Sequence, residues 1–127
     1  MIVLDASAAL SALLNDGPAR QVAGDDQLHA PHLIDAEVVN GLRRLAAART
    51  VPVAAARAAL RTWPRLAVTR YPLVGLLDRV WELRDTVSAY DAAYVALAES
   101  LDCVLVTADA RLSRASGPRC AVTVVPR

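Results

Sequence analysis

Short apolar runs alternate with stretches of helical periodicity along the chain. An apolar run predicts a buried strand, and apolar positions three or four residues apart predict an amphipathic helix. We therefore expect strands at residues 2–4, 28–30, 66–68, 103–106 and 121–125. We expect helices at residues 7–15, 19–23, 32–49, 52–63, 72–84, 88–101 and 110–115. Strands alternating with helices predict an α/β fold whose mostly parallel sheet carries helices on both faces.

The pattern also predicts which elements are buried. Residues 103–106 and 121–125 are continuously apolar, which is typical of parallel strands covered on both faces. The Ala-rich helix at 88–101 is apolar on most sides, so we expect it in the core. The helices at 32–49 and 52–63 are expected to form a hairpin, because only a short break near Pro52 separates them.

Size and composition narrow the class of protein. A chain of 127 residues predicts one domain over residues 1–127. No apolar stretch approaches the roughly 20 residues of a membrane span, and no secretory signal is visible, so we expect a cytoplasmic protein. Cys103 and Cys120 lie in apolar runs without CxxC spacing, which predicts two buried free thiols.

The charged residues exclude several chemistries. All fourteen basic residues are Arg, and the absence of Lys excludes a P-loop lysine, a Schiff-base lysine and the lysine of a receiver-like phosphoacceptor. Seven of the arginines fall in residues 43–70, where there is no acid. This basic stretch is open to three interpretations: contact with RNA, contact with an acidic protein segment, or solubility alone.

Four acids occupy positions where apolar residues are expected. Asp5 and Asp109 each close a strand-like run, and the carboxyl ends of parallel strands form the edge where open α/β sheets bind ligands. Glu37 and Asp91 each lie on the apolar stripe of a helix. Buried carboxylates are rare unless they are paired or bound to a cation. The set predicts a site for Mg²⁺ or Mn²⁺, with water attack on a phosphodiester as its use.

Each acid also has a purely structural interpretation. Asp5 and Asp109 fit the N-caps of the helices that follow them. Asp91 fits the capping box that Ser88 opens, and Glu37 fits an acid favoured by the helix dipole. A metal centre explains all four together. Without the ion the carboxylates repel one another, so we expect raised pKa values and a melting temperature that rises when metal is added.

Weaker candidates surround these four positions. Ser7 and Thr107 each stand two residues from one of the acids and either hold a carboxylate or a water, or act as turn residues. Arg111 and Arg114 follow Asp109 at helical spacing and either contact a phosphate or form a solvated face.

Four segments carry a resemblance to a known family: Ile2-Val3-Leu4-Asp5-Ala6-Ser7, Glu37, the segment 88–98 and the segment 105–112. In this order they resemble the PIN-domain nucleases and, within them, the VapC toxins of type II toxin–antitoxin pairs, over essentially the whole chain. The resemblance implies a PIN-like three-layer α/β/α sandwich. It also implies an Mg²⁺- or Mn²⁺-dependent endoribonuclease with Asp5, Glu37, Asp91 and Asp109 as catalytic metal ligands and the Ser7 and Thr107 hydroxyls in support.

The resemblance further implies partners. These are an RNA substrate, a second copy in a homodimer, and a cognate VapB-like antitoxin bound in a heterotetramer or larger complex, with operator DNA reached only through the antitoxin and no membrane. The alternative is a catalytically silent PIN-like module that keeps the metal pocket but only binds RNA or protein. The RNA target and the number of metal ions stay open.

Overall fold

The computed structural model describes all 127 residues and contains one five-stranded sheet in which every neighbouring pair is parallel. The strands run in the order β3-β2-β1-β4-β5. Ile2 pairs with Leu28 on one side and with Val104 on the other, so β1 lies in the centre. The strand bounds are β1 (Ile2–Leu4), β2 (Leu28–Pro31), β3 (Val68–Tyr71), β4 (Val104–Thr107) and β5 (Val122–Val124).

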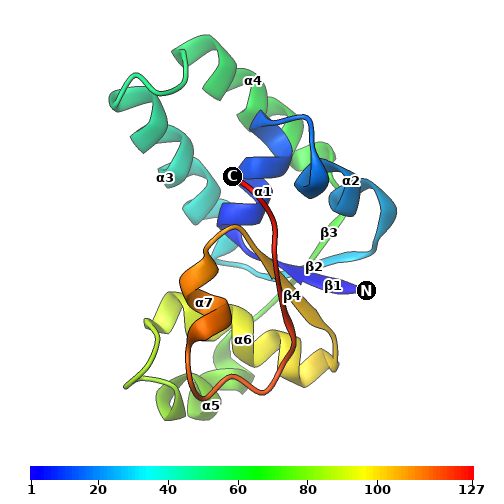
Figure 1. Cartoon of the computed structure of the whole chain (residues 1–127), viewed down its shortest axis with the longest axis vertical. Helices are drawn as coiled ribbons and strands as arrows, with labels where there is room; N and C mark the ends of the chain where they lie inside the picture. Colours follow the sequence, from blue (N-terminus) through cyan, green and yellow to red (C-terminus); the bar gives the residue numbers. More distant parts are fainter.

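Helices cover both faces of the sheet, as Figure 1 shows. One layer holds α1 (Ala6–Leu14), α2 (Pro18–Asp25), α3 (Ile34–Ala47) and α4 (Val53–Thr62). The other side holds α5 (Leu77–Glu82), α6 (Ala89–Leu101) and the short α7 (Ala110–Arg114). Two 3₁₀ turns, η1 (Trp63–Arg65) and η2 (Val74–Leu76), complete the chain. The expected three-layer α/β/α arrangement is therefore confirmed.

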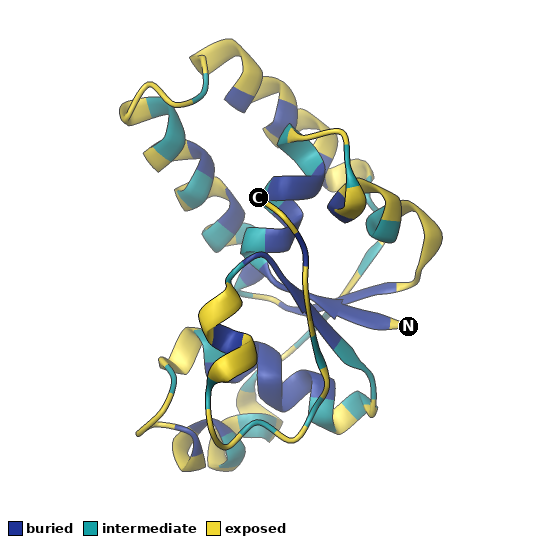
Figure 2. Ribbon diagram, viewed as in Figure 1, coloured by how far each residue is buried: buried dark blue, intermediate teal, exposed yellow.

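The core lies along the central strand and the helix packed across it. Every residue of β1 is buried, and α6 is buried continuously over 92–98, where it contacts β1, β2 and β4 (Figure 2). Four of the seven residues 92–98 are Ala, and these small side chains allow the helix to pack closely against the sheet. The prediction that this helix belongs to the core is confirmed. No helix has both the length and the apolar character that crossing a membrane requires.

The first and third helices also approach each other closely. A Cβ atom at Gly41 of α3 would lie 2.3 Å from Cδ1 of Leu10 on α1, so the missing side chain leaves room for that leucine. The helices α3 and α4 contact each other along the expected hairpin. This packing fixes the first turn of α3, and therefore Glu37, relative to the edge of the sheet.

Two strand predictions were wrong in detail. The segment 121–125 was expected to be covered on both faces, but β5 is an edge strand and Val124 is 41% exposed. The third strand was expected at residues 66–68, whereas β3 begins at Val68. The backbone N–H of Leu66 bonds to the carbonyl of Trp63, which closes the turn η1 and delays the strand.

Two other expectations need correction. The helix expected over 72–84 is broken into η2 and the short α5. Cys103 and Cys120 are free thiols, as expected, but both are half-buried instead of buried.

Candidate active site

The carboxyl ends of two central strands bring Asp5 and Asp109 to one edge of the sheet. Asp5 follows β1 directly, and Asp109 comes two residues after the end of β4. Leu4 pairs with Val106 in the parallel register, so the two acids extend from neighbouring strands in the same direction. Each also caps a helix, since Asp5 accepts from the Ala8 N–H and Asp109 from the Arg111 N–H. The capping interpretation is therefore confirmed for both acids, and both also lie at the carboxyl ends of neighbouring strands.

Asp5 is almost completely enclosed, with 5% of its surface exposed. Its Oδ1 accepts hydrogen bonds from the Ser7 hydroxyl at 2.7 Å and the Ala8 N–H at 2.9 Å, and its Oδ2 accepts from the Thr107 hydroxyl at 2.5 Å. Burial raises the pKa of Asp5 above its ordinary value, although these hydrogen bonds act in the opposite direction. The fold holds this carboxylate in place without any cationic partner.

Ser7 and Thr107 form a bridge between the two capped turns. Their hydroxyl oxygens lie 3.2 Å apart. The Ala108 N–H donates to the Ser7 hydroxyl at 2.8 Å, and the Asp109 N–H donates to the Thr107 hydroxyl at 3.0 Å. Both hydroxyls also donate to Asp5. The structure thus places them as supports of the Asp5 carboxylate, one of the two roles considered from the sequence.

Glu37 enters the same region from the first turn of α3. The Tyr94 hydroxyl donates to its Oε1 at 2.6 Å. Burial raises the pKa of Glu37, the negative charges of Asp91 and Asp5 raise it further, and the tyrosine bond acts to lower it. Burial and the neighbouring carboxylate in turn raise the pKa of Tyr94, which keeps its hydroxyl protonated.

Sequence reasoning missed this partner of Glu37. No role was predicted for Tyr94, whose side chain is 2% exposed. Its position three residues after Asp91 on a buried helix was the available signal, because a buried tyrosine hydroxyl usually finds a hydrogen-bond acceptor.

Asp91 lies in the first turn of α6 and links the other carboxylates electrostatically. Its backbone N–H donates to the Ser88 hydroxyl at 3.1 Å, as the capping box predicted. Burial is the main cause of its raised pKa, and the charge of Asp109 is the next. Asp91 in turn raises the pKa values of Asp5 and Glu37. The four acids therefore share one negative field, with Asp91 coupled to every other member.

Asp109 differs because it has a cationic partner. The Arg111 side chain donates from Nε to Oδ1 at 3.1 Å and from Nη2 to Oδ2 at 2.9 Å, and the Arg111 N–H donates to Oδ1 at 3.0 Å. These bonds, the side-chain pair first, hold the pKa of Asp109 below its ordinary value. Arg114 is exposed and its side chain has no hydrogen bond or ion pair in the structure.

The remaining three acids lack any cation of the protein itself. None of the five ion pairs in the structure involves Asp5, Glu37 or Asp91. One buried and two half-buried carboxylates with raised pKa values offer oxygen donors only, which fits a hard divalent cation. No three His, Cys, Asp or Glu side chains are already arranged around one point as metal ligands. The four carboxylates therefore shift one another's pKa values, but their oxygens do not meet around a common point in this structure.

Neighbouring groups outside this set have structural partners. Asp35, two residues before Glu37, accepts from Arg70 at 2.7 and 2.8 Å and from the Trp63 indole at 2.7 Å. Arg70, one of the seven arginines of the basic stretch, is therefore already paired with an acid of the protein. His29 is buried and its Nδ1 lies 2.7 Å from the Tyr71 hydroxyl, so this side chain also has a partner within the fold.

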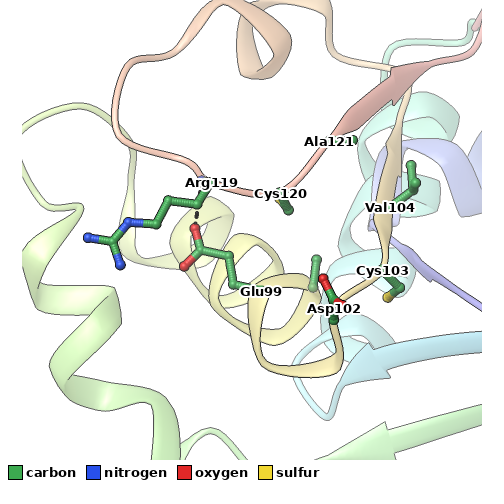
Figure 3. A pocket seen from close by; sticks show the side chains of 8 residues that line it. Glu99, Asp102, Cys103, Val104, Arg119, Cys120 and Ala121 are labelled. Carbon is green, nitrogen blue, oxygen red and sulfur yellow. Dashed lines mark hydrogen bonds between the residues drawn. The ribbon is translucent and has the colours of Figure 1, made fainter.

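A separate cavity of about 460 Å³ lies at the opposite end of the strands from the four acids. Figure 3 shows Glu99 and Cys103 on one side and Arg119 and Cys120 on the other. Cys103 and Cys120 precede β4 and β5, so the cavity lies at the amino ends of these strands. Ligands of open α/β sheets bind at the carboxyl ends, where the acids lie. This cavity is not part of the candidate site.

Comparison with known proteins identifies the family. The PIN domain family model matches residues 2–118. The chain is 62% identical over 127 residues, covering 100% of both chains, to a Mycobacterium tuberculosis protein named "Ribonuclease VapC9".

Two solved structures share the fold. The crystal structure of PAE2754 from Pyrobaculum aerophilum has a TM-score of 0.70 at 28% identity, covering 95% of this chain and 81% of that one. VapBC2 from Rickettsia felis, bound to a DNA fragment from its promoter, has a TM-score of 0.66 at 15% identity, covering 97% and 98%. The second shows the fold alone. By its domain match and its full-length relative, the chain belongs to the PIN-domain family and, within it, to the VapC ribonucleases.

Proposed function

We propose that residues 1–127 form a single PIN domain that acts as the toxin of a type II toxin–antitoxin pair and hydrolyses RNA phosphodiesters at Asp5, Glu37, Asp91 and Asp109. The observation that carries the site is electrostatic. Three mutually interacting carboxylates have raised pKa values and no cationic partner, in a chain 62% identical to a named ribonuclease. A divalent cation supplies the missing positive charge.

The chemistry assigns a role to each residue. PIN-domain VapC nucleases depend in general on a divalent metal ion, and we propose Mg²⁺, or Mn²⁺ in its place. When bound, the ion activates water and stabilises charge on the phosphate. The four acids would hold the ion, and the Ser7 and Thr107 hydroxyls orient Asp5. Tyr94 orients Glu37 through its hydrogen bond to Oε1.

We place the substrate and partners around this edge of the sheet. Arg111 and Arg114 extend from α7 beside Asp109 and are proposed to contact RNA phosphates, which Arg binds with two parallel hydrogen bonds. The basic stretch 43–70 is proposed to bind RNA or an acidic segment of a VapB-like antitoxin. We further propose that the protein is a cytoplasmic homodimer. The antitoxin joins this dimer in a heterotetramer or larger complex, which contacts operator DNA only through the antitoxin.

The test is metal-dependent cleavage of total RNA by purified protein. Wild type and Asp91→Asn are incubated with Mg²⁺, with Mn²⁺ and with EDTA, and the fragment ends are analysed. The matched control is Asp25→Asn, the same substitution at an exposed acid of α2 that makes no side-chain hydrogen bond in the structure. Discrete cuts that require metal, persist in Asp25→Asn and vanish in Asp91→Asn are expected. Equal cutting by all three proteins would contradict the assignment.

The alternative, a silent PIN-like binding module that keeps the pocket, predicts a different pattern. Mg²⁺ or Mn²⁺ would then raise the melting temperature of wild type but not of Asp91→Asn, while RNA stayed intact. The 62% identity to a named ribonuclease over the whole chain favours the enzyme.

A further inference from the structure

Arg111 binds both oxygens of the Asp109 carboxylate. The guanidinium reaches both oxygens, with Nε 3.1 Å from Oδ1 and Nη2 2.9 Å from Oδ2. Of the four acids, Asp109 is the only one with a cationic partner. A metal ion that binds Asp109 therefore meets a carboxylate whose two oxygens already accept from a cationic side chain.

We propose that Arg111 is an intramolecular competitor of the metal ion: it pairs with Asp109 in the metal-free protein, leaves when the ion binds, and is then free to contact an RNA phosphate. This inference rests on the proposed function, because it takes Asp109 to be one of the metal ligands. It gives one arginine two alternative partners of the same chemistry, a carboxylate and a phosphate, to which a guanidinium binds through two parallel hydrogen bonds.

The structure shows why the exchange is feasible. The Arg111 side chain is 82% exposed and has no partner other than Asp109, so its departure disrupts no packing. The helix cap does not depend on the guanidinium, because the Arg111 backbone N–H donates separately to Oδ1 at 3.0 Å. The short helix α7 therefore keeps its start when the side chain moves away.

The expected strength of the competition follows from the solvent exposure of the Arg111–Asp109 ion pair. A solvent-exposed ion pair contributes little, so removing Arg111 should tighten metal binding by about two- to fivefold and not by orders of magnitude. Loss of the guanidinium should at the same time raise KM for RNA, because the released side chain no longer reaches a phosphate. The two effects have opposite signs, which a merely structural role of Arg111 would not produce.

The test is calorimetric titration of metal-free protein with Mn²⁺. Wild type is compared with Arg111→Gln and with Arg114→Gln, a matched variant that removes the same charge from the same helix at a residue without an acidic partner. Arg111→Gln should bind Mn²⁺ about two- to fivefold more tightly than wild type, and Arg114→Gln should match wild type within about 1.5-fold. In an Asp109→Asn background the gain from Arg111→Gln should disappear.

Three results would overturn the competition: unchanged or weaker Mn²⁺ binding in Arg111→Gln, an equal gain in Arg114→Gln, or a gain that persists with Asp109→Asn. The last two would show a general charge effect. RNA cleavage is measured separately on the same proteins. Wild type that binds no Mn²⁺ overturns both proposals, whereas tighter binding in Arg111→Gln without RNA cleavage supports the competition and contradicts the ribonuclease.

Discussion

Two acids in the first turn of α3, only two residues apart, have opposite electrostatic surroundings. Asp35 accepts from Arg70 and from Trp63, and the Arg70 hydrogen bond is the main cause of its lowered pKa. Glu37 has no cationic partner, and its pKa is raised by burial and then by Asp91 and Asp5. Asp35 therefore has a cationic partner within the protein, whereas Glu37 has none.

The same contrast separates two larger regions. At the far side of α6, Glu99 accepts from Arg79 at 2.7 and 3.0 Å and from the Arg119 N–H at 2.8 Å. Burial acts to raise the pKa of Glu99, but these bonds outweigh it and the pKa is lowered. At the candidate site, by contrast, the pKa values of Asp5, Glu37 and Asp91 are raised. A raised carboxylate pKa next to other acids points to a functional site, whereas a lowered one beside Arg occurs both in the structural pair of Glu99 and, at Asp109, within the candidate site.

The largest expected effect is the loss of activity in Glu37→Gln. We expect RNA cleavage to fall by at least about 100-fold, because even residues that only support a metal site commonly cost 10- to 100-fold when they are replaced. Asp35→Asn, its neighbour on the same turn, should retain the activity of wild type per folded molecule. Cleavage rates measured at saturating Mg²⁺ check both variants. Equal losses in the two would remove the distinction between these acids.

The next effect is on stability. Glu99→Gln weakens three hydrogen bonds that reach a largely enclosed carboxylate, so we expect a loss of about 2 kcal/mol in the free energy of unfolding. Urea denaturation with a constant m-value measures it. Cleavage activity below the transition should remain, since the pair lies away from the pocket. A variant as stable as wild type would mean that this network does not stabilise the fold.

A smaller effect is expected from Tyr94→Phe, which removes only the hydroxyl that donates to Glu37. Glu37 then loses its one hydrogen-bond donor, and metal affinity should fall about tenfold. Tyr90→Phe is the matched control, because Tyr90 is exposed and its hydroxyl makes no hydrogen bond in the structure. Mn²⁺ titration distinguishes them; similar affinities for both variants would show that Tyr94 serves packing alone.

The smallest expected effect is a gain in stability, opposite in sign to the losses predicted above. Asp91→Asn removes the charge that couples the pocket acids, so the metal-free protein should gain roughly 0.5 kcal/mol at pH 7, a value kept low because Asp91 is only half-buried. Thermal unfolding in EDTA measures the gain. Metal should reverse the order of stability, because wild type then binds the ion more tightly.

The dependence on pH sharpens this test. The raised pKa of Asp91 means that its ionised form costs stability above that pKa, so the advantage of Asp91→Asn should shrink as the pH falls through it. Glu99 behaves inversely: its lowered pKa contributes stability that is fully present above the ordinary value of 4.5 and is lost only below it. At pH 5 the effect of Glu99→Gln should therefore persist. Parallel pH profiles for the two variants would contradict the comparison.

Local patterns predicted most of the frame of this protein. The apolar run before Asp5 and the cap residues Ser88 and Asp109 define strand and helix starts through interactions within a few residues, so sequence alone located β1, α6 and α7. Periodicity placed Glu37 and Asp91 on helix faces that turn inward. These are short-range properties, fixed by side-chain spacing and by backbone groups at helix ends.

Tertiary structure decided which polar groups meet across long separations. Asp35 of α3 pairs with Arg70 of β3, and Tyr94 of α6 with Glu37 of α3, only because the fold brings these distant elements together, and no local pattern shows either contact. Strand order also left β5 at an edge, which a continuous apolar run could not reveal. The sequence by itself determined the elements and the four acids, because spacing sets them. The fold decided that Asp35 has an arginine partner and that Glu37 has none, because that depends on the packing of distant segments.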